Sequence, residues 1–346
     1  MNIIDFSHIA IIQTAFLGDI ALTLPLADTI RRFHPSAQIT FISTPIAKPF
    51  VQSTASINNV LSFDKRKSQS GLKGIVQFSN TLRKLNVECI IAPHRSFRTT
   101  LLTYLTRPIT SVGFSRNAAS FLYSRKVEYQ ANLHEVERNI SLLQVFNDIQ
   151  IPINALIPPP SITIPEADTS KIYNLIEKKG LKIPIIAIAP GSVWATKRWC
   201  EDYFVTTAQF LKAKGYSCVF IGGNDDIELC WRLALASGAI SLAGETTIIQ
   251  TIALLKLCSA LLTNDSAPTH LAWIAGCPTA TIFGATSPKF GFAPRGEASV
   301  VLQNETLSCR PCAIHGGNRC PLGTLECMKS VRPERVGLTI ESIVTK

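Results

Sequence analysis

Short apolar runs alternate with longer, helix-like runs along this chain, and the alternation predicts its fold class. The short runs favour β-strands and cover residues 9–13, 38–43, 89–92, 111–114, 185–189, 217–221, 239–242, 260–263 and 279–283. Segments with helical patterns lie between them, at residues 20–33, 201–214, 226–237 and 247–257. Strands that alternate with helices form parallel sheets through right-handed crossovers. We therefore predict an α/β protein.

An uncharged, proline-rich segment divides the strand series into two halves. Residues 149–165 hold no Asp, Glu, Lys or Arg, and they include Pro152, Pro158, Pro159, Pro160 and Pro165. Such a segment cannot form a regular helix. We expect it to join two Rossmann-like domains, residues 1–157 and 158–346.

Composition supports a folded protein of about two domains. The chain has 346 residues, of which 46% are hydrophobic and 17% charged, so it does not resemble a disordered chain. Its first residues lack the pattern of a secretory signal, and no stretch suits a membrane span. We expect a cytoplasmic protein.

Positive charge is concentrated in one part of the chain. Between residues 61 and 130, twelve Lys and Arg residues outnumber three Asp and Glu residues, which gives +9 of the formal net charge of +10. Such a field indicates an anionic partner, namely nucleic acid, an anionic membrane or a phosphorylated glycolipid, or it is a solvated basic face. Arg95 and Arg98 follow the strand at 89–92 directly. Ligands gather at the carboxyl ends of such strands, so both are candidates for substrate binding.

The octapeptide at residues 263–270, TNDSAPTH, predicts an anion site. It lies between two apolar runs, as a strand end passing into a helix start does. Asp265 or Ser266 is suited to cap the helix, and Pro268 fits its first turn. The first backbone N–H groups and the helix dipole then favour a diphosphate. The alternative is an ordinary capped helix without a ligand.

Gly18 and Asp19 follow the first predicted strand. Asp19 is suited to accept the proton of a substrate hydroxyl if burial raises its pKa, and Gly18 allows a substrate to approach the backbone closely. The alternative is that Asp19 caps a helix beginning at Ile20. Lys197 follows the strand at 185–189, where its ammonium group would stabilise a diphosphate leaving group.

Four segments, in this order and at these separations, resemble one family. They are residues 11–26 (IIQTAFLGDIALTLPL), 186–192 with 195–199 (IAIAPGS and ATKRW), 263–270, and 281–288 (TIFGATSP). They resemble the ADP-heptose:lipopolysaccharide heptosyltransferases of glycosyltransferase family 9, most closely the heptosyltransferase II branch. The resemblance implies the GT-B fold, with two Rossmann-like domains facing across a cleft. It also suggests a last helix, here near residues 333–344, that crosses back to the first domain.

The resemblance implies roles for several residues. Asp19 matches the catalytic base, and Lys197 matches the lysine that contacts the phosphates. Ser192 matches a hydroxyl donor to a phosphate oxygen. Asp226 matches the ribose-binding Glu with a shorter side chain, and helix capping is its alternative role. Thr246 matches a position near the adenine, or it is a turn residue without a ligand.

The octapeptide departs from the family at one position. The family has glycine where this chain has Ala267, and a positive φ there would cost about 1 kcal/mol or more. Asp265 is expected to orient the loop or to contact the sugar, beside the diphosphate-binding Ser266. His270 either donates to a phosphate or is a core histidine.

The ten cysteines fall into two groups. Six are isolated in apolar surroundings, which is typical of reduced core residues. The other four follow the pattern Cys309-X2-Cys312-X7-Cys320-X6-Cys327. This pattern allows a structural zinc or iron–sulfur knuckle, disulfides or free thiols. We expect no catalytic metal and no required cofactor.

The expected function is an inverting, metal-independent heptosyl transfer. The donor would be ADP-L-glycero-D-manno-heptose, and the acceptor a lipid A–Kdo-type phosphorylated glycolipid at the cytoplasmic face of the inner membrane. Another nucleotide sugar, used for a cell-surface glycan, remains the alternative within this class. A catalytically inactive scaffold is a further alternative, motivated by Ala267. A nucleic-acid partner is not expected, because aromatic–basic interleaving and a recognised RNA-binding motif are lacking.

Overall fold

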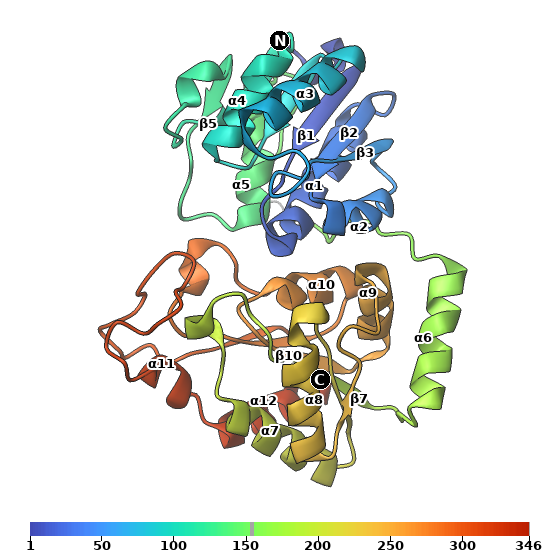
Figure 1. The fold of residues 1–346 in the computed structure, drawn as a ribbon, viewed down its shortest axis with the longest axis vertical. Coiled ribbons are helices and arrows are strands. Elements are labelled where there is room, and N and C mark those ends of the chain that lie inside the picture. Colours follow the sequence, from blue (N-terminus) through green and yellow to red (C-terminus); the bar gives the residue numbers. More distant parts are fainter. Residues whose placement is uncertain (153–155, 346) are drawn as a thin grey trace. The chain divides into compact units, whose positions relative to one another are not determined.

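The computed structural model describes residues 1–152 and 156–345, which form two compact units, Met1–Thr163 and Ile164–Lys346 (Figure 1). The end of the proline-rich segment is held by the first unit. Thr163 N–H donates to Ser53 O at 2.8 Å, and Ser161 N–H donates to Asp28 Oδ2 at 3.3 Å. The division between the units therefore falls after Thr163, a few residues later than the boundary at 157/158 expected from the sequence.

The first unit is built on a six-stranded sheet in the order β3-β2-β1-β4-β5-β6, with neighbouring strands parallel. Its strands are β1 (His8–Ile12), β2 (Gln38–Ser43), β3 (Asn59–Ser62), β4 (Cys89–Ala92), β5 (Thr110–Phe114) and β6 (Arg125–Val127). Its α-helices are α1 (Leu17–Phe33), α2 (Lys48–Gln52), α3 (Gly71–Lys84), α4 (Phe97–Thr106) and α5 (Glu135–Ser141). Short 3-10 helices cover Ile3–Asp5, Pro45–Ala47, Ser120–Leu122 and Leu142–Val145.

The second unit repeats this plan with the order β12-β11-β10-β7-β8-β9, again parallel. Its strands are β7 (Ile185–Ala189), β8 (Ser217–Phe220), β9 (Ile240–Ser241), β10 (Ala260–Asn264), β11 (Thr279–Ile282) and β12 (Val300–Leu302). Its α-helices are α6 (Glu166–Lys178), α7 (Glu201–Ala213), α8 (Ile227–Ser237), α9 (Ile248–Leu257), α10 (Ala267–Ala275), α11 (Glu326–Lys329) and α12 (Pro333–Val344). Its 3-10 helices cover Ala195–Lys197, Asn224–Asp226 and Pro288–Phe290.

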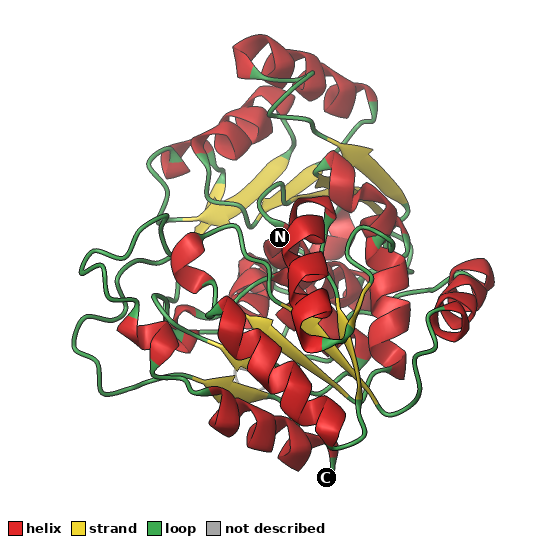
Figure 2. Cartoon of the chain, turned by 60° about the horizontal axis from the view of Figure 1, so that its bottom comes forward, coloured by secondary structure: helices red, strands yellow, loops and turns green. Residues whose placement is uncertain are grey.

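These strand orders define where a ligand would bind in each unit. In a doubly wound sheet the order reverses at a switch point, and ligands bind outside the carboxyl ends of the strands there. The switch point lies between β1 and β4 in the first unit and between β7 and β10 in the second. All four strands are fully buried, and helices flank the strands of each sheet (Figure 2). The α/β prediction is confirmed.

The C-terminal helix α12 has the bounds expected from the sequence. It packs on α7, and Val336, Ile340 and Ile343 lie in the core of the second unit. Among the residues that the structure describes, no helix has the length and apolar character needed to cross a bilayer.

Candidate active site

Asp19 lies in the first turn of α1, at the carboxyl end of β1. The expectation that the helix begins at Ile20 is wrong, since α1 begins at Leu17 with Phe16 as its N-cap residue. Asp19 is thus the third helical residue, and its Oδ2 accepts the backbone N–H of Phe16 at 3.2 Å. The carboxylate closes the first turn without being the N-cap, and Gly18 is buried beside it.

His94 ties the loops after β1 and β4 together at the switch point. Its Nδ1 lies 3.0 Å from Thr99 Oγ1 and 3.3 Å from Thr14 Oγ1. Burial, helped by the positive charges of Lys65 and Arg95, lowers the pKa of His94 to about 4. The imidazole is therefore neutral at physiological pH.

Arg98 supports the loop that carries Lys65. Its Nη1 donates to Lys65 O at 3.1 Å. Burial lowers the pKa of Lys65, as do the neighbouring Arg66 and Arg98, while the carboxylate of Asp19 acts in the opposite direction. Lys65 and Asp19 therefore share one electrostatic environment.

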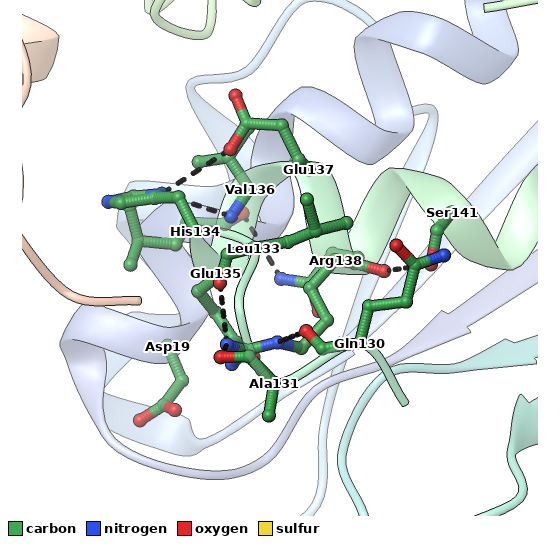
Figure 3. Close-up of polar contacts among 12 residues, drawn as sticks. Asp19, Gln130, Ala131, Leu133, His134, Glu135, Val136, Glu137, Arg138 and Ser141 are labelled. Carbon is green, nitrogen blue, oxygen red and sulfur yellow. Dashed lines mark hydrogen bonds and ion pairs between the residues drawn. The ribbon is translucent and has the colours of Figure 1, made fainter. Parts of the chain in front are cut away.

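Arg95 stacks on an aromatic ring. Its guanidinium carbon lies 3.9 Å from the ring centroid of Tyr129, and that of Arg138 lies 4.5 Å from the same centroid. Arg138 is buried, pairs with Glu135 and donates to backbone carbonyls, including Gln130 O at 3.1 Å (Figure 3). Two arginines therefore stack on one ring, on the same unit as Asp19.

Glu135 is a second carboxyl group near Asp19. Burial raises its pKa to about 7; the pairing with Arg138 opposes this shift, and the charge of Asp19 adds to it. The asparagine that follows Arg138 holds α5 against α1, since Asn139 Nδ2 donates to Leu22 O at 3.2 Å. Sequence reasoning missed Tyr129, Glu135 and Arg138. The sequence signal for Glu135 and Arg138 was an acidic and a basic residue three positions apart, which is common on exposed helices.

In the second unit, Lys197 and Asp265 form a largely buried ion pair. Lys197 Nζ lies 2.7 Å from Asp265 Oδ2 and donates to Asp265 O at 3.3 Å. Thr286 Oγ1 donates to the same Oδ2 at 2.7 Å. Three of the four sequence segments therefore meet at this carboxylate, which orients the ammonium group.

The anion site expected at α10 has the backbone geometry it requires. Ser266 is the N-cap residue, but its hydroxyl donates to Asn264 O at 3.3 Å and does not cap the helix. Within residues 1–152 and 156–345, no hydrogen bond engages the backbone N–H of Ser266 or Ala267. Ala267 is the first helical residue and does not have a positive φ, so the backbone cost considered above does not arise. His270 is buried in the same helix.

Asp226 lies between the loops after β7 and β8. Its Oδ2 accepts the N–H of Gly223 at 3.0 Å, which is a capping role, and burial raises its pKa. A Cβ built on Gly191 would come within 2.2 Å of Asp226 Oδ1, so a larger residue there would have to displace this carboxylate. The neighbouring Ser192 accepts a hydrogen bond at its carbonyl from Arg198 Nε at 2.8 Å.

Thr246 and the cysteines are the remaining residues predicted from the sequence. Thr246 Oγ1 lies 2.9 Å from Thr251 Oγ1, just before α9. All ten cysteines are free thiols, with Cys309 and Cys312 exposed. Across the described parts of the chain, no three His, Cys, Asp or Glu side chains are arranged to hold a metal ion. The cysteine-rich segment contacts the loop that carries Lys197. Thr196 N–H donates to Gly317 O at 3.0 Å, and Gly317 N–H donates to Thr196 Oγ1 at 2.8 Å.

Comparison with known proteins decides the family. Residues 75–318 match the model of glycosyltransferase family 9 (heptosyltransferase). The chain belongs to this family. The resemblance drawn from the four segments is thereby confirmed, and the protein is a glycosyltransferase of the heptosyltransferase family.

Curated relatives and solved structures agree with this family. The chain is 26% identical over 332 residues to lipooligosaccharide heptosyltransferase 2 of Campylobacter jejuni, covering 93% of each chain. It is 23% identical to lipopolysaccharide heptosyltransferase 2 of Escherichia coli K12, covering 82% of this chain and 84% of the relative. The solved family 9 glycosyltransferase from Veillonella parvula superposes with a TM-score of 0.87 at 19% identity, covering 100% and 98%. The structure of E. coli ADP-heptose lps heptosyltransferase II gives 0.79 at 20% identity, covering 98% of each. These structures confirm the GT-B fold of two Rossmann-like domains.

Proposed function

We propose that this family 9 glycosyltransferase moves a heptosyl residue from ADP-L-glycero-D-manno-heptose to a lipid A–Kdo-type phosphorylated acceptor of the lipopolysaccharide inner core. The names of its relatives support the acceptor class. The donor is supported by solved E. coli relatives, described as heptosyltransferase WaaC with ADP and with ADP-2-deoxy-2-fluoro heptose. The observation that carries the proposal is the Lys197–Asp265 pair beside the first turn of α10.

The donor side uses charge to stabilise the leaving group. As the glycosidic bond breaks, the diphosphate gains negative charge, which the ammonium group of Lys197 and the first amides of α10 would offset. Asp265 holds Lys197 in place and partly balances its charge before the donor binds. Ser192 and His270 would donate to the phosphates, while Asp226 and Thr246 would contact the nucleoside. This compensation of charge would not need a metal ion.

The acceptor side would supply one base and several cations. Asp19 would take the proton of the attacking hydroxyl, and a single base opposite a departing diphosphate gives inversion at the sugar carbon. Arg95 and Arg98 would bind anionic groups of the acceptor. The basic stretch 61–130 would also bring the protein to the cytoplasmic face of the inner membrane.

The donor assignment is tested by thermal melting with ADP, GDP or UDP. We expect a rise in Tm with ADP only, and we expect Lys197→Met to remove most of it by deleting the charge that faces the diphosphate. Lys182→Met, at an exposed position of the same unit, serves as the matched control. A rise in Tm with UDP or GDP in place of ADP would favour another nucleotide sugar as the donor. No rise with any nucleotide would contradict activity as a nucleotide-sugar transferase.

The base assignment needs a separate variant. Asp19→Asn should lower the transfer rate by at least about a hundredfold, which is a typical contribution of a general base, and leave the ADP-induced rise in Tm unchanged. Release of ADP in the presence of acceptor is the measurement. Near-normal turnover in Asp19→Asn would show that another group takes the proton.

A further inference from the structure

A pocket in the first unit has an amphipathic lining, of which Arg98 alone has been given a role above. It lies between the N-terminal turns of α3 and α4, two helices that pack side by side (Figure 1). Its volume is about 550 Å³, within the range of small-molecule sites. The polar part of its lining, called the cationic end, consists mainly of the cations Lys65 and Arg98 with the neutral His94 beside them. The remaining lining, the apolar wall, consists mainly of Leu72, Ile75, Phe97 and Leu101.

The cationic end gathers positive charge that the carboxylate of Asp19 offsets only in part. Over the described ranges 1–152 and 156–345, no carboxylate forms an ion pair with Lys65 or Arg98. The nearest acid along the chain, Asp64, is turned away, since its carboxylate accepts the N–H groups of Lys67 and Ser68. Burial and the neighbouring arginines already disfavour the charge on Lys65. An anion bound here would relieve that repulsion.

The apolar wall is also incomplete without a ligand. Ile75 is buried, but Leu72 and Phe97 in the same lining are 63% and 62% exposed. Large apolar side chains that flank a cavity mark a binding surface more often than isolated exposed ones do. Two such side chains next to the cations Lys65 and Arg98 favour a ligand with an anionic head and an apolar tail.

We propose that this pocket binds an anionic amphiphile, with a phosphate group at the cationic end and an alkyl chain along the apolar wall. The natural ligand is the phosphorylated and acylated part of the glycolipid acceptor. This assignment rests on the proposed function. The +9 charge of residues 61–130 matches such a ligand in sign. The pocket would hold the lipid end of the acceptor on the same unit as Asp19.

Direct binding of simple probes tests the pocket without any transfer reaction. Isothermal titration would compare octyl phosphate below its micelle concentration, inorganic phosphate and octyl glucoside. We expect one octyl phosphate to bind per chain, at least about tenfold more tightly than either other probe, because only it uses both parts of the pocket.

Two variants separate the head from the tail. Lys65→Gln should weaken octyl phosphate and inorganic phosphate alike, by about tenfold, whereas Phe97→Ser should weaken octyl phosphate only. Phe97→Leu, which keeps an apolar side chain, should bind octyl phosphate nearly as the wild type does. Matched controls on the same unit are Lys126→Gln and Phe121→Ser, both at exposed positions outside the pocket. They should leave all three probes unchanged.

Several results would overturn the proposal. Equal affinity for octyl phosphate and inorganic phosphate, or no effect of Phe97→Ser, would show that the apolar wall binds nothing. Octyl glucoside binding as tightly as octyl phosphate would exclude an anion site. Binding to anionic vesicles without binding of the monomeric probe would assign these residues to membrane adsorption instead. Failure of the proposed function would be seen separately, as loss of the ADP response in protein that still binds octyl phosphate.

Discussion

Glu135 is a carboxylic acid in a position where burial opposes its charge. Its pKa rises from 4.5 to about 7 despite the pairing with Arg138. Between pH 4.5 and about pH 7, Glu135 therefore keeps its proton in the folded chain and has lost it in the unfolded chain. The stabilisation from this bound proton is complete below about pH 4.5 and is lost as the pH rises through about 7. The free energy of unfolding therefore falls across this range.

Replacing this acid should alter the pH dependence of stability. Glu135→Gln removes the titrating group, so the Tm of the variant minus that of the wild type should increase between about pH 5 and about pH 8. Thermal melting across this range is the measurement. Glu128→Gln, exposed just after β6, is the control and should give a constant difference. A constant difference for Glu135→Gln as well would show that Glu135 is charged throughout.

At the scale of elements, Gly191 shows how two loops share one space. A methyl group there would collide with the carboxylate of Asp226 and displace it from Gly223 N–H. Gly191→Ala should therefore destabilise the second unit by about 1–3 kcal/mol and reduce the ADP-induced rise in Tm. Gly223→Ala is the matched control, because its Cβ would meet open space at a φ of −79°. Equal behaviour of the two variants would contradict this close approach.

The central strands could be predicted from sequence, whereas three of the four edge strands could not; the fourth, β9, lies within the predicted run at 239–242. The ranges of β2, β4 and β7 match the predicted runs, because nearly all of their residues are buried and most are apolar or β-branched. The strands β3, β6 and β12 were missed. Each has only three or four residues and exposes part of its length, so it has no such signal.

The candidate site was predictable where it follows strand ends. Lys197 and Asp265 come from motifs at the carboxyl ends of β7 and β10, and the structure brings them into contact. The group around Glu135 was not predictable. Its burial arises from the packing of α5 on α1 and from the stacking on Tyr129, which depend on contacts between segments far apart in the chain.

For the whole molecule, the uneven charge predicts different salt effects on the two substrates. The acceptor would meet a stretch with a net charge of +9 whose charges are mostly exposed, and screening over about 10 Å at 0.1 M salt weakens such attraction. The KM for the acceptor should rise several-fold between about 0.05 and 0.3 M salt. The Kd for ADP, measured by titration, should change less, because the Lys197–Asp265 pair is largely buried. An equal response of both constants would argue against this division of roles.

The contact between Gly317 and Thr196 bears on how variants of Lys197 should be interpreted. Two hydrogen bonds between Thr196 and Gly317 hold the loop that carries Lys197, and neither involves the lysine side chain. Exchanging the lysine for an uncharged residue should leave the path of the main chain intact. A loss of function in such a variant then reports the missing positive charge and not a collapsed loop.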